Sequence, residues 1–199
     1  MVLAPFKIKK IRDMRDVKDW SDITVGQYQE MMLVETSNNI TRFIECLSIA
    51  LDCDPAEIRE MPFADYNKLQ KKMDFISREP SADIVERFEL DGVRYGLEPD
   101  MSLITTGVFI DAEQFKQDPI VNLHNTLALI YRPIISETDD DWQIEPHQAK
   151  GFEKRANLFK EKMSIETVLG ATLFFSTLGV ELSIHFLTSL NKTLTEKED

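Results

Sequence analysis

The segment RFELDGVRYGL, residues 87–97, constrains the fold more than any other stretch of the chain. Apolar and polar side chains alternate on both sides of Asp91 and Gly92, which is the pattern of half-buried β-strands. Asp-Gly adopts the positive φ angles that a two-residue type I′ turn requires. We therefore predict an antiparallel hairpin with strands at about 85–90 and 93–98. Since an isolated hairpin is barely stable in water, it must pack on helices or join another sheet.

Most of the remaining sequence has helical signals. Thr24 followed by Gln27 fits a capping box, and Asp54-Pro55 is a second strong helix start. Apolar residues then recur at intervals of three or four, which predicts helices at 25–35, 40–51, 55–61, 63–77, 111–117, 119–132, 147–163 and from 165 onward. The predicted fold class is mainly α (α+β), a multi-helix domain with a small β-hairpin insertion.

The charge distribution divides the chain unevenly. Its net charge is −12, which argues against a general nucleic-acid-coating protein, because such a protein needs a basic face. Residues 1–18 nevertheless hold six basic and two acidic residues, a balance of +4. The expected organisation is a basic arm at 1–20, one α-rich domain at 21–194 that carries the hairpin at about 85–98, and a frayed tail at 195–199.

A basic arm on an acidic body can dock on an acidic neighbour, including a second copy of the chain. A solvated tail without a partner is the alternative interpretation. The side chains of the arm that we expect to bind a partner are Lys7, Lys9, Lys10, Arg12, Arg15 and Lys18.

Two features bear on the cellular environment. The uncharged run 167–180 has 14 residues, whereas a membrane-spanning helix needs about 20, so we predict a buried core helix there and no membrane partner. Cys46 and Cys53 lie seven positions apart, which is too far on a helix for a disulfide. We expect two buried thiols in a reducing compartment.

A short pattern, I-T-x-G-x-aromatic, occurs at 23–28 and again at 104–109. Neither copy has the further glycines or the lysine of a phosphate-binding loop. We interpret both as helix starts, with Thr24 as one N-cap and Thr105 or Thr106 as the other. Gly26 and Gly107 would then lie in first turns, where the missing side chain lets another backbone pack close.

No arrangement of reactive side chains predicts catalysis, a metal ion or a cofactor. His124, His147 and His185 stand on separate segments without metal-ligand spacing. The acidic run 139–141 lacks the glycine that an EF-hand loop requires, because Ile144 occupies that position. We predict that 134–145 is a solvated acidic loop. Trp142 within it is a candidate partner-binding residue, since a loop tryptophan beside charges is often buried on binding.

The order of several segments carries a family resemblance: WSDITVGQYQEMM, CLSIALDCDPAEIREMPFADYNKLQKKMDFI, FELDGVRYGLEPDMSLITTGVFIDAEQF, NLHNTLALIYRPI and LGATLFFSTLGVEL. In this order and spacing the chain resembles small proteins from the structural-gene clusters of tailed phages of Bacteroidetes, including crAss-like phages. The likeness covers roughly residues 20–190. It implies a non-enzymatic role in virion morphogenesis, with other phage structural proteins and further copies of the chain as partners.

Two versions of that role remain open. A ring or connector subunit of the head–tail or tail region would stay in the virion, and its hairpin could add to a neighbour's sheet. A tail assembly chaperone would act in the host cytoplasm and be absent from the particle. It could offer a client the apolar residues Met31, Met32, Phe174, Phe175 and Phe186. An α-helical enzyme or ligand-binding protein is the alternative from another functional class.

Overall fold

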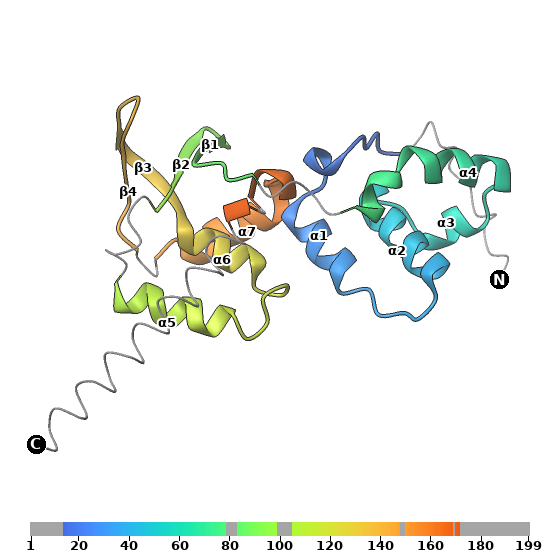
Figure 1. Ribbon diagram of the computed structural model, residues 1–199, viewed down its shortest axis with the longest axis horizontal. Helices are drawn as coiled ribbons and strands as arrows, with labels where there is room; N and C mark the ends of the chain where they lie inside the picture. Colours follow the sequence, from blue (N-terminus) through green and yellow to red (C-terminus); the bar gives the residue numbers. More distant parts are fainter. Residues whose placement is uncertain (1–13, 79–82, 99–104, 148–149, 169, 172–199) are drawn as a thin grey trace, which may run out of the picture.

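The computed structural model describes residues 14–78, 83–98, 105–147, 150–168 and 170–171, and it has an α+β architecture (Figure 1). The first part is helical: η2 (Trp20–Asp22), α1 (Val25–Met32), α2 (Asn39–Leu51), α3 (Pro55–Arg59), α4 (Phe63–Lys72) and η3 (Asp74–Ser77). The second part combines strands and helices: β1 (Arg87–Leu90), β2 (Val93–Leu97), α5 (Thr106–Phe115), α6 (Leu123–Ile130), β3 (Tyr131–Glu137), β4 (Trp142–Ile144) and α7 (Phe152–Lys162).

The helix starts follow local capping chemistry. Thr24 accepts a hydrogen bond from the Gln27 amide at 3.2 Å, and the Gln27 side chain accepts one from the Thr24 amide at 3.1 Å. This is the predicted capping box. Asp54 caps α3 with Pro55 at the first position, also as predicted, and Thr105 caps α5. The helix α1 ends at Met32, however, which is earlier than the predicted end at residue 35.

Four strands form one antiparallel sheet in the order β1-β2-β3-β4. The predicted hairpin is β1–β2, and Asp91 and Gly92 have φ angles of 53° and 74° in its turn. The hairpin is therefore half of a larger sheet, and the expected small β-hairpin insertion is not confirmed.

The acidic loop predicted at 134–145 is wrong, because this segment contributes β3 and β4. We expected Pro133 to end a helix, but it lies inside β3. Proline has no N–H group to donate, but its carbonyl oxygen still accepts a hydrogen bond from the Glu145 amide at 2.8 Å. This bond lies at the end of β4, where a missing donor costs little pairing.

Two predicted helix starts also require correction. The helix α6 begins at Leu123 and not at Pro119, since residues after Asp118 form turns. The helix α7 begins at Phe152 after Gly151, which has a φ of 88°, and not at Pro146. In both cases a proline favourable at a helix start lies instead in a turn or an extended segment.

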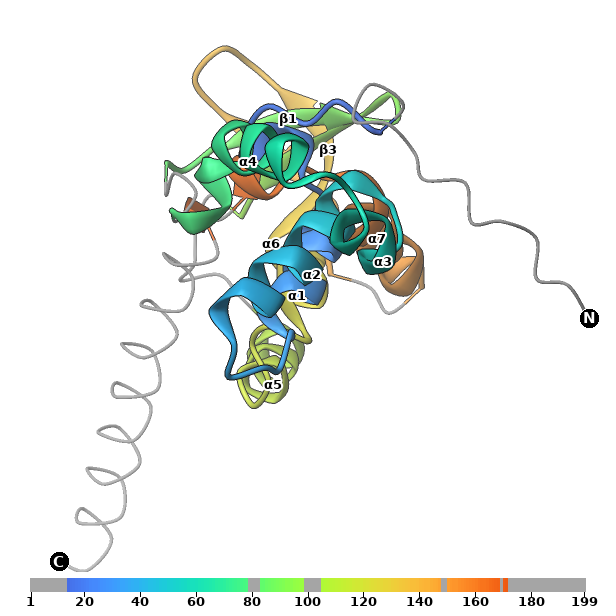
Figure 2. The same ribbon diagram turned by 90° about the vertical axis from the view of Figure 1, so that its right-hand side faces the viewer.

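The sheet packs on α6 and α7, and α5 lies on the other side of these helices (Figures 1 and 2). Aromatic rings fill the space between the sheet and α7. Tyr95 and Phe159 have ring centroids 5.0 Å apart, and Phe88 lies 5.1 Å from Tyr131. Phe159 and Tyr131 are fully buried. Burying such rings stabilises this layer.

The helix α1 joins the two parts of the molecule. The Val25 amide donates to the Met163 carbonyl at 2.9 Å, and the Ile165 amide donates to the Ile23 carbonyl at 2.9 Å. A Cβ atom on Gly26 would lie 2.8 Å from the Lys160 carbonyl oxygen, so only glycine allows this approach of α1 to α7. The predicted close backbone packing is confirmed at Gly26. At Gly107 the described residues show no such packing, because the atom found near an added Cβ is the Thr105 hydroxyl oxygen, 3.8 Å away.

The cysteine and membrane expectations have mixed outcomes. Cys46 is buried and Cys53 is half-buried, and neither forms a disulfide. Burial raises the pKa of the Cys46 thiol. Among the residues that the structure describes, no helix has the length and apolar character needed to cross a membrane. Most of the run 167–180 and the tail 195–199 lie outside the described residues.

Candidate functional site

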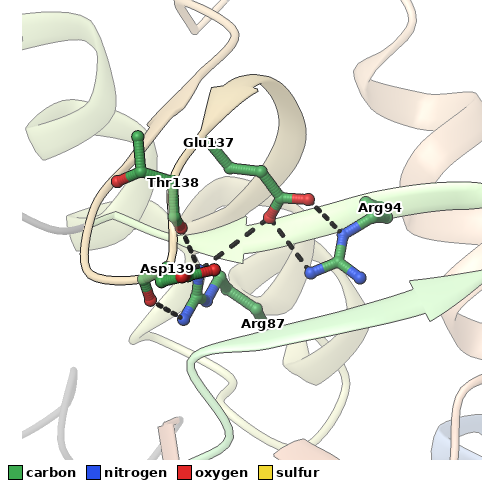
Figure 3. A pocket seen from close by; sticks show the side chains of 5 residues that line it. All are labelled: Arg87, Arg94, Glu137, Thr138 and Asp139. Carbon is green, nitrogen blue, oxygen red and sulfur yellow. Dashed lines mark hydrogen bonds and ion pairs between the residues drawn. The ribbon is translucent and has the colours of Figure 1, made fainter.

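The outer face of the sheet, turned away from α7, carries a cluster of charged side chains that we call the arginine face (Figure 3). It consists of Arg87, Arg94, Glu137, Thr138, Asp139 and Trp142. The first five of these residues line an open hollow of about 460 Å³. They come from β1, β2, the end of β3 and the β3–β4 turn, so the face exists only in the folded sheet.

A close contact between two hairpins builds this face. The β3–β4 hairpin folds over β2 and places the Trp142 ring directly on Gly96. A Cβ atom on Gly96 would lie 2.6 Å from two atoms of that ring, so a side chain there would displace it. The Trp142 indole donates to the Leu97 carbonyl at 2.8 Å. The register shift between Ile134 and Ser136 supplies the bend that this arrangement needs.

Arg87 fastens the turn of one hairpin to the strand of the other. Its guanidinium donates to the carbonyl oxygens of Thr138 and Asp139, both at 3.0 Å. The same group lies 4.9 Å from the centroid of the Trp142 ring, within range of a cation–π interaction. Arg87 therefore contributes to the shape of the face as well as to its charge.

Arg94 is the more accessible cation of the face. It forms a bidentate ion pair with Glu137, with nitrogen–oxygen distances of 2.8 and 3.0 Å, and half of its side chain is exposed. Glu137 also lies 3.9 Å from Arg87. Because Glu137 and Asp139 balance the two arginines, the face has no strong field of one sign. It suits directional contacts with carbonyl or carboxylate groups better than binding of a polyanion.

Opposite Gly96 in the same sheet, Arg132 forms a buried ion pair that the sequence did not indicate. Arg132 is 6% exposed and pairs with Glu98, and it also donates to the Glu145 carbonyl at 2.9 Å. Burial lowers the pKa of the Arg132 guanidinium. The helix predicted at 119–132 would have ended at Arg132, whereas the residue lies in β3. The neighbouring residue, Tyr131, donates a hydroxyl hydrogen bond to the Val85 carbonyl at 2.5 Å. The start of β3 is therefore held by side chains on both sides of the sheet.

The residues predicted to bind partners are not brought together. Trp142 lies on the arginine face, half-buried by its own sheet. Arg15 lies beside α1 and α2, where it donates to the Gln27 side chain at 2.9 Å and to the Ala50 carbonyl at 3.3 Å. The exposed Lys18 bonds through its main-chain amide to Asp22 at 2.8 Å.

The remaining four, Lys7, Lys9, Lys10 and Arg12, lie outside the described residues. Val17 is fully buried, so the packed body includes residues that we had assigned to the arm.

The two described histidines have separate structural partners. His124 lies 3.1 Å from the side-chain oxygen of Gln29, and burial, reinforced by Lys160, lowers its pKa. His147 lies 3.1 Å from an Asp111 oxygen. Among the described residues, no three His, Cys, Asp or Glu side chains are grouped as a metal site. His185 falls outside that part of the chain.

In comparisons with known proteins, no protein-family model, curated protein or solved structure matches the chain.

Proposed function

We propose that the chain is a non-enzymatic morphogenesis protein of a tailed phage, a ring or connector subunit of the head–tail or tail region. It acts through protein–protein contacts with other phage structural proteins and with further copies of itself. The observation that carries the proposal is the edge strand β1 beside the arginine face, which among the described residues pairs with β2 alone. Edge strands are ready sites for pairing with another chain.

The chemistry of the arginine face supports binding over turnover. Arg87 is held by two main-chain carbonyls and Arg94 by Glu137, so both cations have fixed geometry. Fixed guanidinium groups at a surface recognise carbonyl and carboxylate groups with directional hydrogen bonds. The acidic net charge of −12 would also let such a subunit lie near DNA without adhering to it. The expected location is the virion, or the host cytoplasm during assembly.

A tail assembly chaperone is the second candidate, and exposed apolar side chains favour it. Phe63 is 74% exposed and Ile40 is 66% exposed, so both could contact an apolar client. The client-binding residues that we expected need revision, because Met31 is fully buried and only Met32 is accessible, at 37%. The three expected phenylalanines, Phe174, Phe175 and Phe186, lie outside the described residues.

Quantitative proteomics of gradient-purified particles separates these candidates. A connector subunit is expected in constant stoichiometry with the major virion proteins. A chaperone is expected to be absent from particles and to co-purify with unassembled tail protein. Steady turnover of a substrate by the purified chain would contradict both candidates.

A pair of variants tests whether the arginine face is needed for particle assembly. Replacement Arg94→Glu should lower the yield of complete particles, because it places a second carboxylate against Glu137. The matched control Lys154→Glu makes the same charge change at an exposed position of α7 and should leave the yield unchanged. Equal yields for the two variants would remove the arginine face from the proposed function.

A further inference from the structure

The edge strand β1 has a backbone that is available on one side. Among the described residues, β1 pairs with β2 alone. The Leu97 amide donates to the Glu86 carbonyl at 2.8 Å, which fixes the phase of the ladder. Residues alternate in an antiparallel ladder, so Glu86 and Phe88 direct their amide and carbonyl groups toward β2. Arg87 and Glu89 then direct theirs to the outer edge.

The strand is short, but it lacks three of the devices that protect sheet edges. Its sequence, RFEL, contains no proline and no lysine, and its register with β2 is continuous, without a bulge. At the other edge of the sheet, β4 is folded over β2 by the Trp142 contact. These contacts hold β4 in place, while the outer edge of β1 has no partner strand among the described residues.

We propose that β1 pairs antiparallel with β1 of a second copy of this chain, with Arg87 of each copy opposite Glu89 of the other. In this register the outward backbone groups of both residues face each other, and each such pair exchanges two hydrogen bonds. The two-fold symmetry repeats every contact. The pairing deepens the proposed function and rests on it for its biological role, since it would join two subunits of an assembly.

Charge complementarity favours a second copy of the chain as the partner of the β1 edge. The side chains of Arg87 and Glu89 lie on the same outer face, because Phe88 between them points into the core. Each copy therefore presents a cation and an anion in reversed order to its partner. Opposite charges directly across two strands stabilise pairing, and like charges oppose it.

The present contacts of the two side chains are compatible with this arrangement. Arg87 donates to two carbonyls and lies against Trp142, but its guanidinium has five N–H groups in all. Glu89 is exposed and lies opposite Arg94 within its own sheet. In the pair it would lie between Arg94 and the second copy's arginine, which gives an alternating row of charges across the joined sheets.

Sedimentation equilibrium of the full chain tests the pairing. The wild-type chain is expected to form a reversible dimer within the micromolar to millimolar range. Glu89→Lys should weaken the dimer by about tenfold or more, because it places a lysine opposite Arg87 of the other copy at both symmetry-related contacts. The control Glu60→Lys makes the same charge change on an exposed residue of the helical part and should leave the dimer constant unchanged.

Mixing two complementary variants gives the sharper result. Arg87→Glu alone opposes two carboxylates and should also weaken the homodimer about tenfold. Mixed with Glu89→Lys, it restores opposite charges at both contacts of a heterodimer. We expect the mixture to recover wild-type affinity, whereas neither variant does so alone. No other surface of the chain would produce this reciprocal recovery.

Several outcomes would overturn the pairing. They are a wild-type monomer at all concentrations, a Glu89→Lys dimer as strong as the control, and a mixture without recovery. Arg87→Glu also removes contacts to the β3–β4 turn, so circular dichroism must first show that it folds. If it does not fold, Glu89→Pro decides, because it removes both the outward amide and the carboxylate and leaves the amides that pair with β2; an undiminished dimer then rejects the pairing.

Failure of the pairing and failure of the proposed function are distinguishable. A chain that is monomeric but present in particles rejects the β1 pairing and retains the connector role. A chain that dimerises through β1 but is absent from particles retains the β1 pairing and rejects the connector role.

Discussion

The helical part, residues 14–78, and the sheet part, the described residues between 83 and 171, differ in the burial of their ion pairs. In the helical part, the ion pairs Lys68–Asp65 and Arg78–Asp74 join residues three or four positions apart on exposed surfaces. In the sheet part, the ion pair Arg132–Glu98 joins distant residues and is buried. Local contacts are visible in a sequence, while distant ones depend on the complete fold.

The two parts also differ in how their surfaces are used. In the helical part, polar groups cap helix ends or face solvent, and large apolar side chains such as Phe63 are left exposed. In the sheet part, Arg87 and Trp142 connect two hairpins into one face. A surface assembled from several strands has more fixed geometry than a helix end, which is why we assign the partner-binding role to it.

The largest expected difference between the parts concerns their ion pairs. Arg132→Met should lower the free energy of unfolding by about 3–5 kcal/mol, because it leaves Glu98 buried without its partner. Arg59→Met removes the exposed pair with Glu45 and should cost less than about 1 kcal/mol. Urea denaturation of both variants at neutral pH measures the difference. Similar losses would mean that the buried pair is not a main support of the sheet part.

The second prediction concerns the junction of the two parts. Gly26→Ala should destabilise the protein by about 1–3 kcal/mol, since the new methyl group would press on the Lys160 carbonyl. Gly107→Ala is the matched control, because it has the same position in a related helix start and, among the described residues, the added methyl group would make only an ordinary contact with the Thr105 hydroxyl at 3.8 Å. It should stabilise the protein by up to about 1 kcal/mol through helix propensity. Thermal denaturation gives the sign, and two changes of the same sign would contradict the packing argument.

These contrasts indicate how much the sequence could predict. The capping box at Thr24 and the Asp91-Gly92 turn depend on neighbouring residues, and both were predicted correctly. The β3–β4 hairpin was missed because Pro133 and the acidic turn resemble a helix end followed by a loop. Its strands form only because β2 offers an edge for pairing.

The candidate site was predictable only in part. Trp142 was identified as a contact residue, but Arg87 and Arg94 were not, since an arginine on the polar side of a strand is usually solvated. Gly96 was the available signal. A glycine inside a strand often marks the close approach of another group, and here that group is the Trp142 ring.

The third prediction compares the same capping device in the two parts. Thr24→Ala removes the hydroxyl that accepts from the Gln27 amide, which is one half of the capping box, and should cost about 1–2 kcal/mol; the bond from the main-chain amide of residue 24 to the Gln27 side chain remains possible. Thr105→Ala removes a single bond to the Val108 amide and should cost about 0.5–1 kcal/mol. Thr→Ser at each site keeps the hydroxyl group and serves as the control. A larger loss at Thr105 would show that the capping box adds nothing to α1.

The smallest expected effect is a pH dependence at the junction, where His124 contacts Gln29. Burial lowers the pKa of His124 in the folded state below its ordinary value of 6.5, so the folded protein favours the neutral ring. The unfolded chain therefore binds a proton first as the pH falls. Stability contributed by the neutral ring is complete above about 6.5 and is lost as the pH falls from there through the folded-state pKa.

This dependence can be isolated with a substitution that does not titrate. In His124→Asn, the amide can still donate to Gln29, but the proton-linked loss of stability between neutral and mildly acidic pH should disappear. The comparison uses the free energy of unfolding of both proteins over that interval, relative to their values at neutral pH. His147→Asn is the control, because this histidine lies beside Asp111, away from the junction. If His124→Asn retains the full wild-type slope, the linkage belongs to other groups, and the junction is held by the Gly26 contact and the paired backbone beside it rather than by the histidine.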